Sequence, residues 1–336
     1  MTTVTPPLVN PAARAAARRA RLNTVDARAS RVLKWLAMIG GSLVFVAMLL
    51  IAYQVIDGAT TAFNKFGFAF LGHTTWIPAT GQFGAGAYIY GTLISSVFAI
   101  ILATILGVAI GLFLGLMAPR RVAAIVGPLV EMLAAIPSVV LGLIGIFLIC
   151  PFIKNDIEPP LHDVLGFLPF FGAPQPIGNS MFAASLVLTI MVLPIIAALT
   201  RDLFMTVPSE LRDGAEALGA TRWEMIRGVV LPTTSSGVIA ACVLGFGRAI
   251  GEAIAVSQVI GDQPLIHPNL FLPGNSIASV IALQYPSAVS KLHTSSLFYL
   301  ATILFVFSLL TNLAARQIAG GRIRFSLTAD TAAVRR

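Results

Sequence analysis

Two side chains of opposite charge lie four residues apart inside an otherwise apolar stretch of the sequence. The stretch reads Gly-Phe-Gly-Arg-Ala-Ile-Gly-Glu, so Arg248 and Glu252 are expected on one helix face that the glycines keep open. A guanidinium presents a fork of donors that matches a tetrahedral oxyanion such as phosphate. Glu252 could neutralise Arg248 when no anion is bound, or accept a proton from monoprotonated phosphate, which sulfate at neutral pH lacks. The alternative is a structural ion pair with a neighbouring helix, and we favour the functional interpretation.

A second concentration of charge lies between residues 201 and 232. Ser209 follows a proline and is expected to cap a helix that runs over residues 210–218. Gly219 is expected to end this helix in the left-handed conformation, because a residue without a Cβ adopts it at no steric penalty. The first half of the segment is therefore predicted to be a short helix with a sharp stop.

The second half of the same segment carries another helix start. Thr221 and Glu224 have the three-residue spacing of a capping box, in which each side chain bonds the backbone of the other residue. Pro232 is expected to follow this second helix. Two short helices around one glycine would make a compact knob.

These charged segments are exceptions in an apolar chain. Hydrophobic residues make up 57% of the 336 residues and charged residues 11%, against roughly 25% in a soluble domain. Lipid must therefore solvate much of the surface, and apolar runs near 20 residues can span it as helices. Six runs are predicted to do so: 33–55, 90–117, 123–152, 181–199, 237–260 and 296–315. Pro137 is expected to kink the third run, and Glu131 at its inner end to face the cytoplasmic interface.

Lys and Arg are distributed unevenly between the two sides of this arrangement. With the N-terminus inside, the outer segments carry only Lys65, Lys154 and Lys291, and arginines concentrate in the inner loops and the C-terminal tail. The positive-inside rule then places both termini in the cytoplasm and explains the net charge of +8 without nucleic-acid binding. The expected organisation is a tail over residues 1–32, a membrane domain over 33–316 with an inner loop at 201–232, and a tail over 317–336. The first run is too long for a cleaved signal peptide, and part of the first tail is expected to be disordered.

The segments on the outer side are long and are expected to be folded, because they are rich in glycine, proline and aromatic residues. They cover residues 56–89, 153–180 and 261–295. Asn275 and Ser276 are expected to cap a short helix that runs to Gln284 and ends at Pro286. Such a surface could receive an extracytoplasmic partner or simply pack onto the helices.

Several kinds of site have no signature in the sequence. The four histidines are scattered without ligand spacing, and Cys150 and Cys242 lie in apolar runs, so neither a metal site nor a disulfide is expected. There is no Gly-x-x-x-x-Gly-Lys-Ser/Thr loop to hold ATP and no nucleophile–base set. We therefore expect neither an enzyme nor a bound cofactor.

The inner loop resembles the EAA loop of the permeases of ABC importers. The matching positions are Asp213, Gly214, Ala215, Gly219, Val229, Leu231 and Pro232. The acid is Asp rather than Glu, the first small residue is Gly, and Val replaces the usual Ile. The resemblance implies that residues 209–222 form a coupling helix docked in a groove of a cytoplasmic ATPase, which uses ATP with Mg.

Three other segments resemble one branch of that superfamily, the phosphate importer permeases of the PstC type. They are the Gly-x-Gly-Arg-Ala-x-Gly-Glu stretch, the residues from Glu131 through Pro137 to Val140, and the lead into the second run from Phe83 to Leu93. The resemblance implies a type I ABC importer permease fold with six transmembrane helices and cytoplasmic coupling helices. It also implies that Arg248 and Glu252 serve phosphate passage. The implied partners are a second permease of the PstA type, a PstB-type ATPase dimer and a PstS-type phosphate-binding protein, at the bacterial inner membrane.

Two alternatives stay open at this point. A permease for another oxyanion, sulfate or molybdate, would share the coupling loop, and the charged pair with its surroundings speaks against it. A secondary transporter would need no ATPase and would carry inverted repeats in its sequence. The loop and the lack of an obvious repeat speak against this second alternative.

Overall fold

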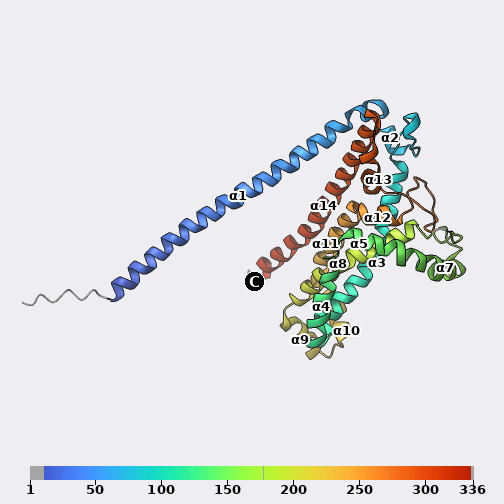
Figure 1. Cartoon of the computed structure of the whole chain (residues 1–336). Coiled ribbons are helices and arrows are strands. Elements are labelled where there is room, and N and C mark those ends of the chain that lie inside the picture. The colour runs from blue at the N-terminus through green and yellow to red at the C-terminus, as the bar shows by residue number, and fades with distance from the viewer. Residues whose placement is uncertain (1–10, 177, 334–336) are drawn as a thin grey trace, which may run out of the picture. The chain divides into compact units, whose positions relative to one another are not determined.

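The protein is described here by a computed structural model, which covers the backbone of residues 11–176 and 178–333 and most side chains from Leu33 to Ala314. Helices dominate it (Figure 1), and the described residues form no strand beyond one bridge between Ile77 and Gln82. Within the described ranges, six helical segments are long and apolar enough to cross a membrane: Leu33–Phe66, Gly86–Met117, Ser138–Leu165, Met181–Met205, Arg222–Gly251 and Lys291–Ala314. The predicted fold class, an all-α protein with six spans, is confirmed.

The chain divides into one unit that ends at Gln54 and a second that begins at Val55. Helix α1, Pro11–Phe66, starts in the first unit and ends in the second, so its helical stretch is longer than the predicted run of 33–55. In the first unit its apolar side chains are exposed almost all round, as for Trp35, Leu43 and Ile51. A helix that is apolar on every side suits a membrane rather than water. Residues 1–10 of the predicted N-terminal tail and 334–336 of the C-terminal tail lie outside the described residues.

The centre of the second unit is a close pair of helices, α3 (Gly86–Leu112) and α8 (Met181–Met205). Small residues let their backbones approach, since a Cβ on Gly107 would lie 2.9 Å from the Ile196 side chain. The Thr200 hydroxyl donates to the Ile196 carbonyl at 2.7 Å, which satisfies it within its own helix. With little apolar driving force between helices in lipid, this close packing is what holds the two elements together.

The prediction that residues 123–152 form a single helix is wrong. Helix α4 covers Arg120–Leu133, and the helical chain resumes only at Ser138, after Pro137 in extended backbone with ψ 136°. A proline donates no backbone hydrogen bond and pushes the preceding residue out of helical geometry, so a break replaces the predicted kink. The resumed segment contains α5 (Ser138–Ile144), α6 (Cys150–Phe152) and α7 (Glu158–Leu165), joined by π-helical turns Gly145–Ile149 and Ile153–Ile157.

This shift also corrects the second outer segment. Residues 153–165, predicted to belong to a loop, are helical and close the candidate span Ser138–Leu165. This candidate span contains three prolines, Pro151, Pro159 and Pro160, and its π-helical turns lie next to them. A π-helical turn shifts the hydrogen-bond register, which lets the chain stay helical around donors that prolines lack.

The fifth predicted run, 237–260, is also divided. A helical stretch begins at Arg222 with α10 (Arg222–Met225), passes through a π-helical turn at Ile226–Val230 and continues as α11 (Leu231–Gly251). Glu252 is extended, with φ −74° and ψ 122°, and α12 (Ile254–Val259) follows. The knob's second helix is therefore the start of this span, and Pro232 lies inside the helical stretch instead of after it.

The segments predicted to lie on the outer side are folded partly around aromatic residues, as predicted. Helices α2 (Ala69–Gly72), α13 (Ile277–Gln284) and the start of α14 (Lys291–Ala333) meet there, with short 3-10 turns at Pro78–Thr80 and Tyr285–Ser287. Phe70 stacks on Tyr299 with ring centroids 4.4 Å apart. The Ser276 hydroxyl accepts from the Ser279 backbone N–H at 3.2 Å. The predicted cap and the predicted helix to Gln284 are confirmed.

Candidate functional site

Arg248 and Glu252 line one cavity of about 530 Å³ in the second unit. The other lining residues are Ile195 of α8, Leu244, Gly247 and Gly251 of α11, and Asn312 of α14. Arg248 is exposed on α11 and Glu252 is half-buried directly beyond the end of that helix. The structure thus brings both charges to one opening formed by three helices.

The geometry of the two charges differs from a shared helix face. Because α11 ends at Gly251, Glu252 stands on extended backbone, and the prediction that both residues lie on one helix is wrong. The ion pairs among the described side chains join Arg201 to Glu131 and to Asp202, and none joins Arg248 to Glu252. The Arg248 guanidinium therefore keeps its donors available to a ligand in the cavity.

The three glycines of this stretch have two different roles. A Cβ on Gly247 or on Gly251 would meet nothing within 4 Å, so both leave the cavity wall open. A Cβ on Gly245 would lie 2.7 Å from the Val192 side chain, so Gly245 instead lets α11 approach α8. Irregular backbone at membrane depth is tolerated where it lines a cavity, which fits the interruption at Glu252.

The predicted knob is built around a left-handed glycine. Helix α9 spans Ser209–Ala217, and Gly219 follows with φ +87°, as predicted. Ser209 is the first helical residue, and the preceding Pro208 provides no side-chain cap, so the prediction of a Ser209 cap is wrong. The capping box is confirmed, with the Thr221 hydroxyl accepting from the Glu224 backbone N–H at 3.3 Å and the Thr221 N–H donating to the Glu224 carboxylate at 2.8 Å.

The predicted coupling residues lie on both sides of this glycine. Asp213, Gly214 and Gly219 are exposed, and Ala215 packs against a small buried cluster at the end of α8. The cluster consists of Phe204, Val207, Met225, Ile226 and Val230. Leu231 and Pro232 begin α11 directly after it. The knob is therefore anchored on the membrane helices by apolar contacts, Ala215 included, and leaves Gly214 and Gly219 exposed.

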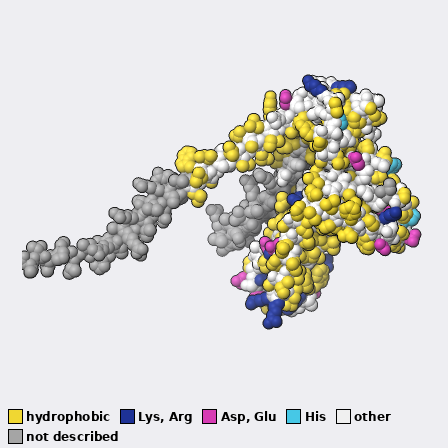
Figure 2. All heavy atoms as spheres, in the orientation of Figure 1, with side chains coloured by type: hydrophobic (Ala, Val, Ile, Leu, Met, Phe, Trp, Pro, Cys, Tyr) yellow, Lys and Arg dark blue, Asp and Glu magenta, His cyan; other side chains and the backbone are white. Residues whose placement is uncertain are grey.

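Large apolar side chains remain exposed on the knob. Leu218 is 92% exposed, and Leu211 and Trp223 are exposed by half or more. Charged side chains gather over the same end of the molecule (Figure 2), at α9 and α10. Exposed apolar side chains inside a charged surface are typical of a site that binds another protein.

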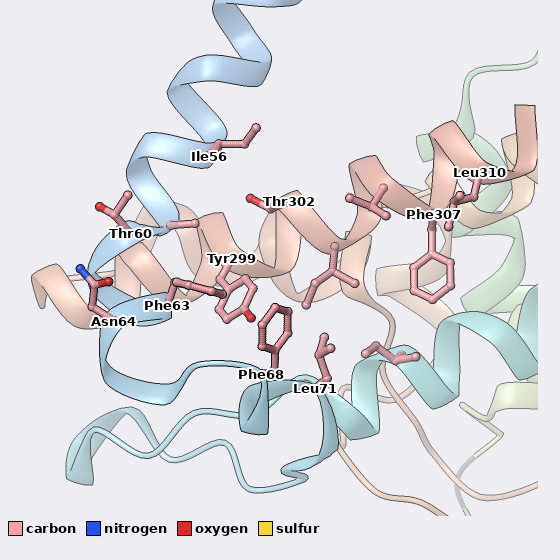
Figure 3. Close-up of a pocket in the computed structure, with 14 residues that line it drawn as sticks. Ile56, Thr60, Phe63, Asn64, Phe68, Leu71, Tyr299, Thr302, Phe307 and Leu310 are labelled. Atoms are coloured by element: carbon pink, nitrogen blue, oxygen red, sulfur yellow. The ribbon is translucent and has the colours of Figure 1, made fainter. Parts of the chain in front are cut away.

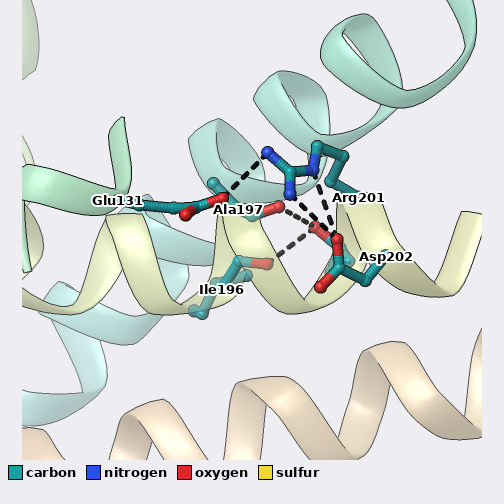
Figure 4. A network of polar contacts seen from close by, with 6 residues as sticks. Glu131, Ile196, Ala197, Arg201 and Asp202 are labelled. Carbon is teal, nitrogen blue, oxygen red and sulfur yellow. Dashed lines mark hydrogen bonds and ion pairs between the residues drawn. The ribbon is translucent and has the colours of Figure 1, made fainter. Parts of the chain in front are cut away.

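A polar network that the sequence did not predict joins α4 to α8 (Figure 4). The Arg201 guanidinium lies 2.9 Å from a carboxylate oxygen of Glu131 and 3.1 Å from one of Asp202. A Cβ on Gly127 would lie 2.7 Å from the Arg201 guanidinium, so a glycine makes room for the arginine. The prediction that Glu131 faces the cytoplasmic interface stays a prediction, and its half-exposed carboxylate also has a partner from a helix distant in the sequence.

A second opening is of a different kind. A groove of about 640 Å³ lies between the end of α1, α3 and α14, and its lining is apolar except for a few neutral polar groups. Phe63, Phe68 and Tyr299 project into it (Figure 3). Without a charged lining residue it does not suit an anion, so the cavity at Arg248 is the better candidate site.

Comparisons with known proteins agree on the kind of protein this chain resembles. The family model described as "Binding-protein-dependent transport system inner membrane component" matches residues 107–322. A phosphate transport system permease protein PstC from Pasteurella multocida is 42% identical over 268 residues, which cover 78% of this chain and 83% of the relative. One from Mesorhizobium japonicum is 38% identical over 82% of this chain and 85% of its own length. PstC 2 of Mycobacterium bovis is 36% identical over 95% of this chain and 99% of its own.

Solved structures show the same fold at low sequence identity. A subunit of the MetNI methionine ABC transporter in an inward-facing conformation aligns with a TM-score of 0.51 and 16% identity, covering 70% of this chain and 94% of its own. A chain from the bacterial alginate ABC transporter, in complex with its alginate-bound periplasmic protein, aligns with a TM-score of 0.54 and 18% identity. That alignment covers 85% of this chain and 95% of the other.

Proposed function

Because this chain belongs to the family of binding-protein-dependent transport system inner membrane components, as one of its PstC phosphate permeases, we propose that it forms half of a path for inorganic phosphate in an ATP-driven importer. It is a multi-pass membrane protein and a transport component. The observation that carries the proposal is the cavity that holds Arg248 and Glu252 together.

Arg248 is the residue expected to meet the anion. A charged side chain at mid-membrane costs at least about 2.5–3.5 kcal/mol, so its position inside a candidate span calls for a partner or a ligand. Its planar guanidinium can bind two oxygens of a phosphate at once. Glu252 lies in the same cavity, where its carboxylate offsets the arginine's charge when phosphate is absent and keeps the anion's affinity low enough for release.

The knob around Gly219 is the proposed coupling element. Residues Asp213, Gly214, Ala215, Gly219, Leu231 and Pro232 would transmit movement from a cytoplasmic ATPase. The exposed side chains of Leu211, Leu218 and Trp223 give this surface an apolar centre for docking. ATP and Mg would be bound by that ATPase, since this chain carries no phosphate-binding loop.

The remaining partners are the components that an ATP-driven importer needs besides this permease. One such permease lines half a path, so a second permease of the PstA type would supply the other half. A dimer of PstB-type ATPases would bind the two knobs, and a PstS-type protein would deliver phosphate to the folded outer segments. This arrangement puts both termini in the cytoplasm, on the side where arginines concentrate.

Reconstitution tests the proposed function. The chain, a PstA-type permease and PstB-type ATPases are placed in proteoliposomes with a PstS-type protein on the outer side, and uptake of radiolabelled phosphate and sulfate is measured. We expect phosphate uptake that requires ATP and the binding protein, and no sulfate uptake. Uptake without ATP, or equal uptake of both anions, would contradict the proposal.

A further inference from the structure

We propose that Asn312 determines which oxyanions the cavity accepts, by favouring those that carry a proton. This inference rests on the proposed function, because it concerns the same cavity. Among the described side chains, Asn312 is the lining residue that α14 contributes to the cavity, which Arg248 lines from α11. With Arg248 and Glu252 it completes the set of polar side chains that line this opening.

The orientation of the Asn312 amide follows from one hydrogen bond. Its Nδ2 donates to the Ser308 carbonyl, four residues back on the same helix, at 2.8 Å. Only the NH₂ end of an amide can donate to a carbonyl, so this bond fixes which end is turned toward the helix backbone. Among the described residues no hydrogen bond engages the carbonyl oxygen Oδ1, so this oxygen can accept one from a ligand in the cavity that Asn312 lines.

An uncharged acceptor distinguishes two classes of tetrahedral oxyanion. Monoprotonated phosphate carries a P–OH that can donate to Oδ1, while sulfate and fluorophosphate at neutral pH have only acceptors to present. An acceptor facing an acceptor leaves both without a partner, and a site built around a hydrogen bond rejects analogues that lack it. The two groups would therefore divide the anion, with Arg248 binding the charged oxygens and Asn312 the hydroxyl.

The Asn312 amide differs from the Glu252 carboxylate, which lines the same cavity, in being uncharged. A carboxylate accepts the same proton, but its negative charge repels every anion in the cavity, protonated or not. The amide accepts a hydrogen bond without that repulsion. Asn312 also stands among exposed apolar side chains of α14 such as Leu309, Leu310 and Leu313, where an amide without a polar role would be unfavourable.

Occupancy of the cavity can be measured directly with a cysteine reporter. Leu244→Cys places a thiol on the cavity wall, in a background where Cys150 and Cys242 are replaced by Ala. The complete complex in nanodiscs is treated with a charged methanethiosulfonate, and protection is titrated with phosphate, sulfate and fluorophosphate. Fluorophosphate is the sharpest probe, because fluorine replaces the hydroxyl at nearly constant size and charge.

With Asn312 present, we expect phosphate to protect at about tenfold lower concentration than fluorophosphate or sulfate. Asn312→Leu and Asn312→Ala should bring that ratio close to one by weakening protection by phosphate, and Asn312→Gln should restore part of it. Thr311→Ala is the matched control, since Thr311 is the neighbour on α14 and bonds within its own helix. It should leave the ratio unchanged.

The outcomes separate the two claims. The role of Asn312 is overturned if, in Asn312→Leu, phosphate still protects at a lower concentration than fluorophosphate or sulfate while the thiol reacts at its normal rate without anion. The proposed function would then still stand. A ratio that falls equally in Thr311→Ala also overturns it, because the effect would then belong to the helix. Failure of phosphate to protect the reporter even with Asn312 present overturns both, since the cavity would then not hold the anion.

Discussion

Gly219→Ala is expected to weaken docking of the ATPase on the knob by a defined amount. Gly219 has φ +87°, a conformation that costs a residue with a Cβ about 1–2 kcal/mol. An added Cβ would meet nothing within 4 Å, so the penalty comes from the backbone alone and not from a clash. The free loop can relax away from this conformation, and docking would have to restore it. A cost of that size raises the dissociation constant roughly 5- to 30-fold.

The matched control is Gly228→Ala. A Cβ at Gly228 also meets nothing within 4 Å, and its φ lies outside the left-handed region. It stands in the π-helical turn Ile226–Val230, where alanine is favoured over glycine by about 0.5–1 kcal/mol. The two variants therefore differ in backbone conformation and not in the space around the new methyl group.

The assay is a titration of the purified ATPase against the permease pair in nanodiscs, with the dissociation constant as the readout. Gly219→Asn should fall between the parent and Gly219→Ala, because asparagine tolerates the left-handed region better than alanine. Equal affinity for Gly219→Ala and Gly228→Ala would refute the reasoning, since it would mean that docking does not depend on this cap.

Three further predictions concern stability, each measured as a thermal midpoint. Gly111→Ala should destabilise the protein by about 1–3 kcal/mol, because the new Cβ would meet the Thr200 hydroxyl of α8, and Gly228→Ala should not; equal effects would contradict the packing argument. Glu131→Gln should cost no more than about 1 kcal/mol, because the ion pair with Arg201 is partly exposed; a larger loss would show that the network is worth more than its exposure suggests. Burial raises the pKa of the Asp262 carboxyl, so its ionisation destabilises the protein as pH rises through that pKa. Asp262→Asn should therefore raise the thermal midpoint near pH 7.5 and change it little below about pH 4. A larger rise at the lower pH than at pH 7.5 would contradict this assignment.

The features that the sequence predicted correctly are local ones. The capping box at Thr221 and Glu224, the left-handed Gly219 and the cap at Ser276 each depend on a few neighbouring residues, which the sequence lists directly. The six spans depend on apolar runs near 20 residues, and lipid leaves the backbone little choice but a helix.

The errors arise where hydropathy and backbone geometry disagree. Residues 123–152 are apolar throughout, but Pro137 interrupts the hydrogen bonds and divides the run. Glu252 was predicted to continue the helix of Arg248, and the chain instead leaves the helix after Gly251. Nothing in the apolar pattern marks either break, because hydropathy measures solvent preference and not the direction of the chain.

Contacts between segments distant in the sequence could not be predicted for a different reason. Arg201 and Glu131 pair across two helices, and Asn312 joins a cavity whose other polar residues lie about sixty positions earlier. A single sequence gives spacing along one helix but not the register between two. Asn312 did leave a signal, an amide in an apolar span, which alone would have suggested a candidate.

The central claim is that Arg248 meets phosphate in the path, and its most direct test is transport by Arg248→Gln. The complete reconstituted complex is compared with its parent for phosphate uptake and for ATP hydrolysis stimulated by the binding protein. We expect uptake to fall at least about tenfold, as loss of a charge-assisted contact predicts, while assembly and ATPase docking are unchanged. Arg248→Lys should retain part of the uptake, because it keeps the charge without the fork. Normal uptake by Arg248→Gln would contradict the account.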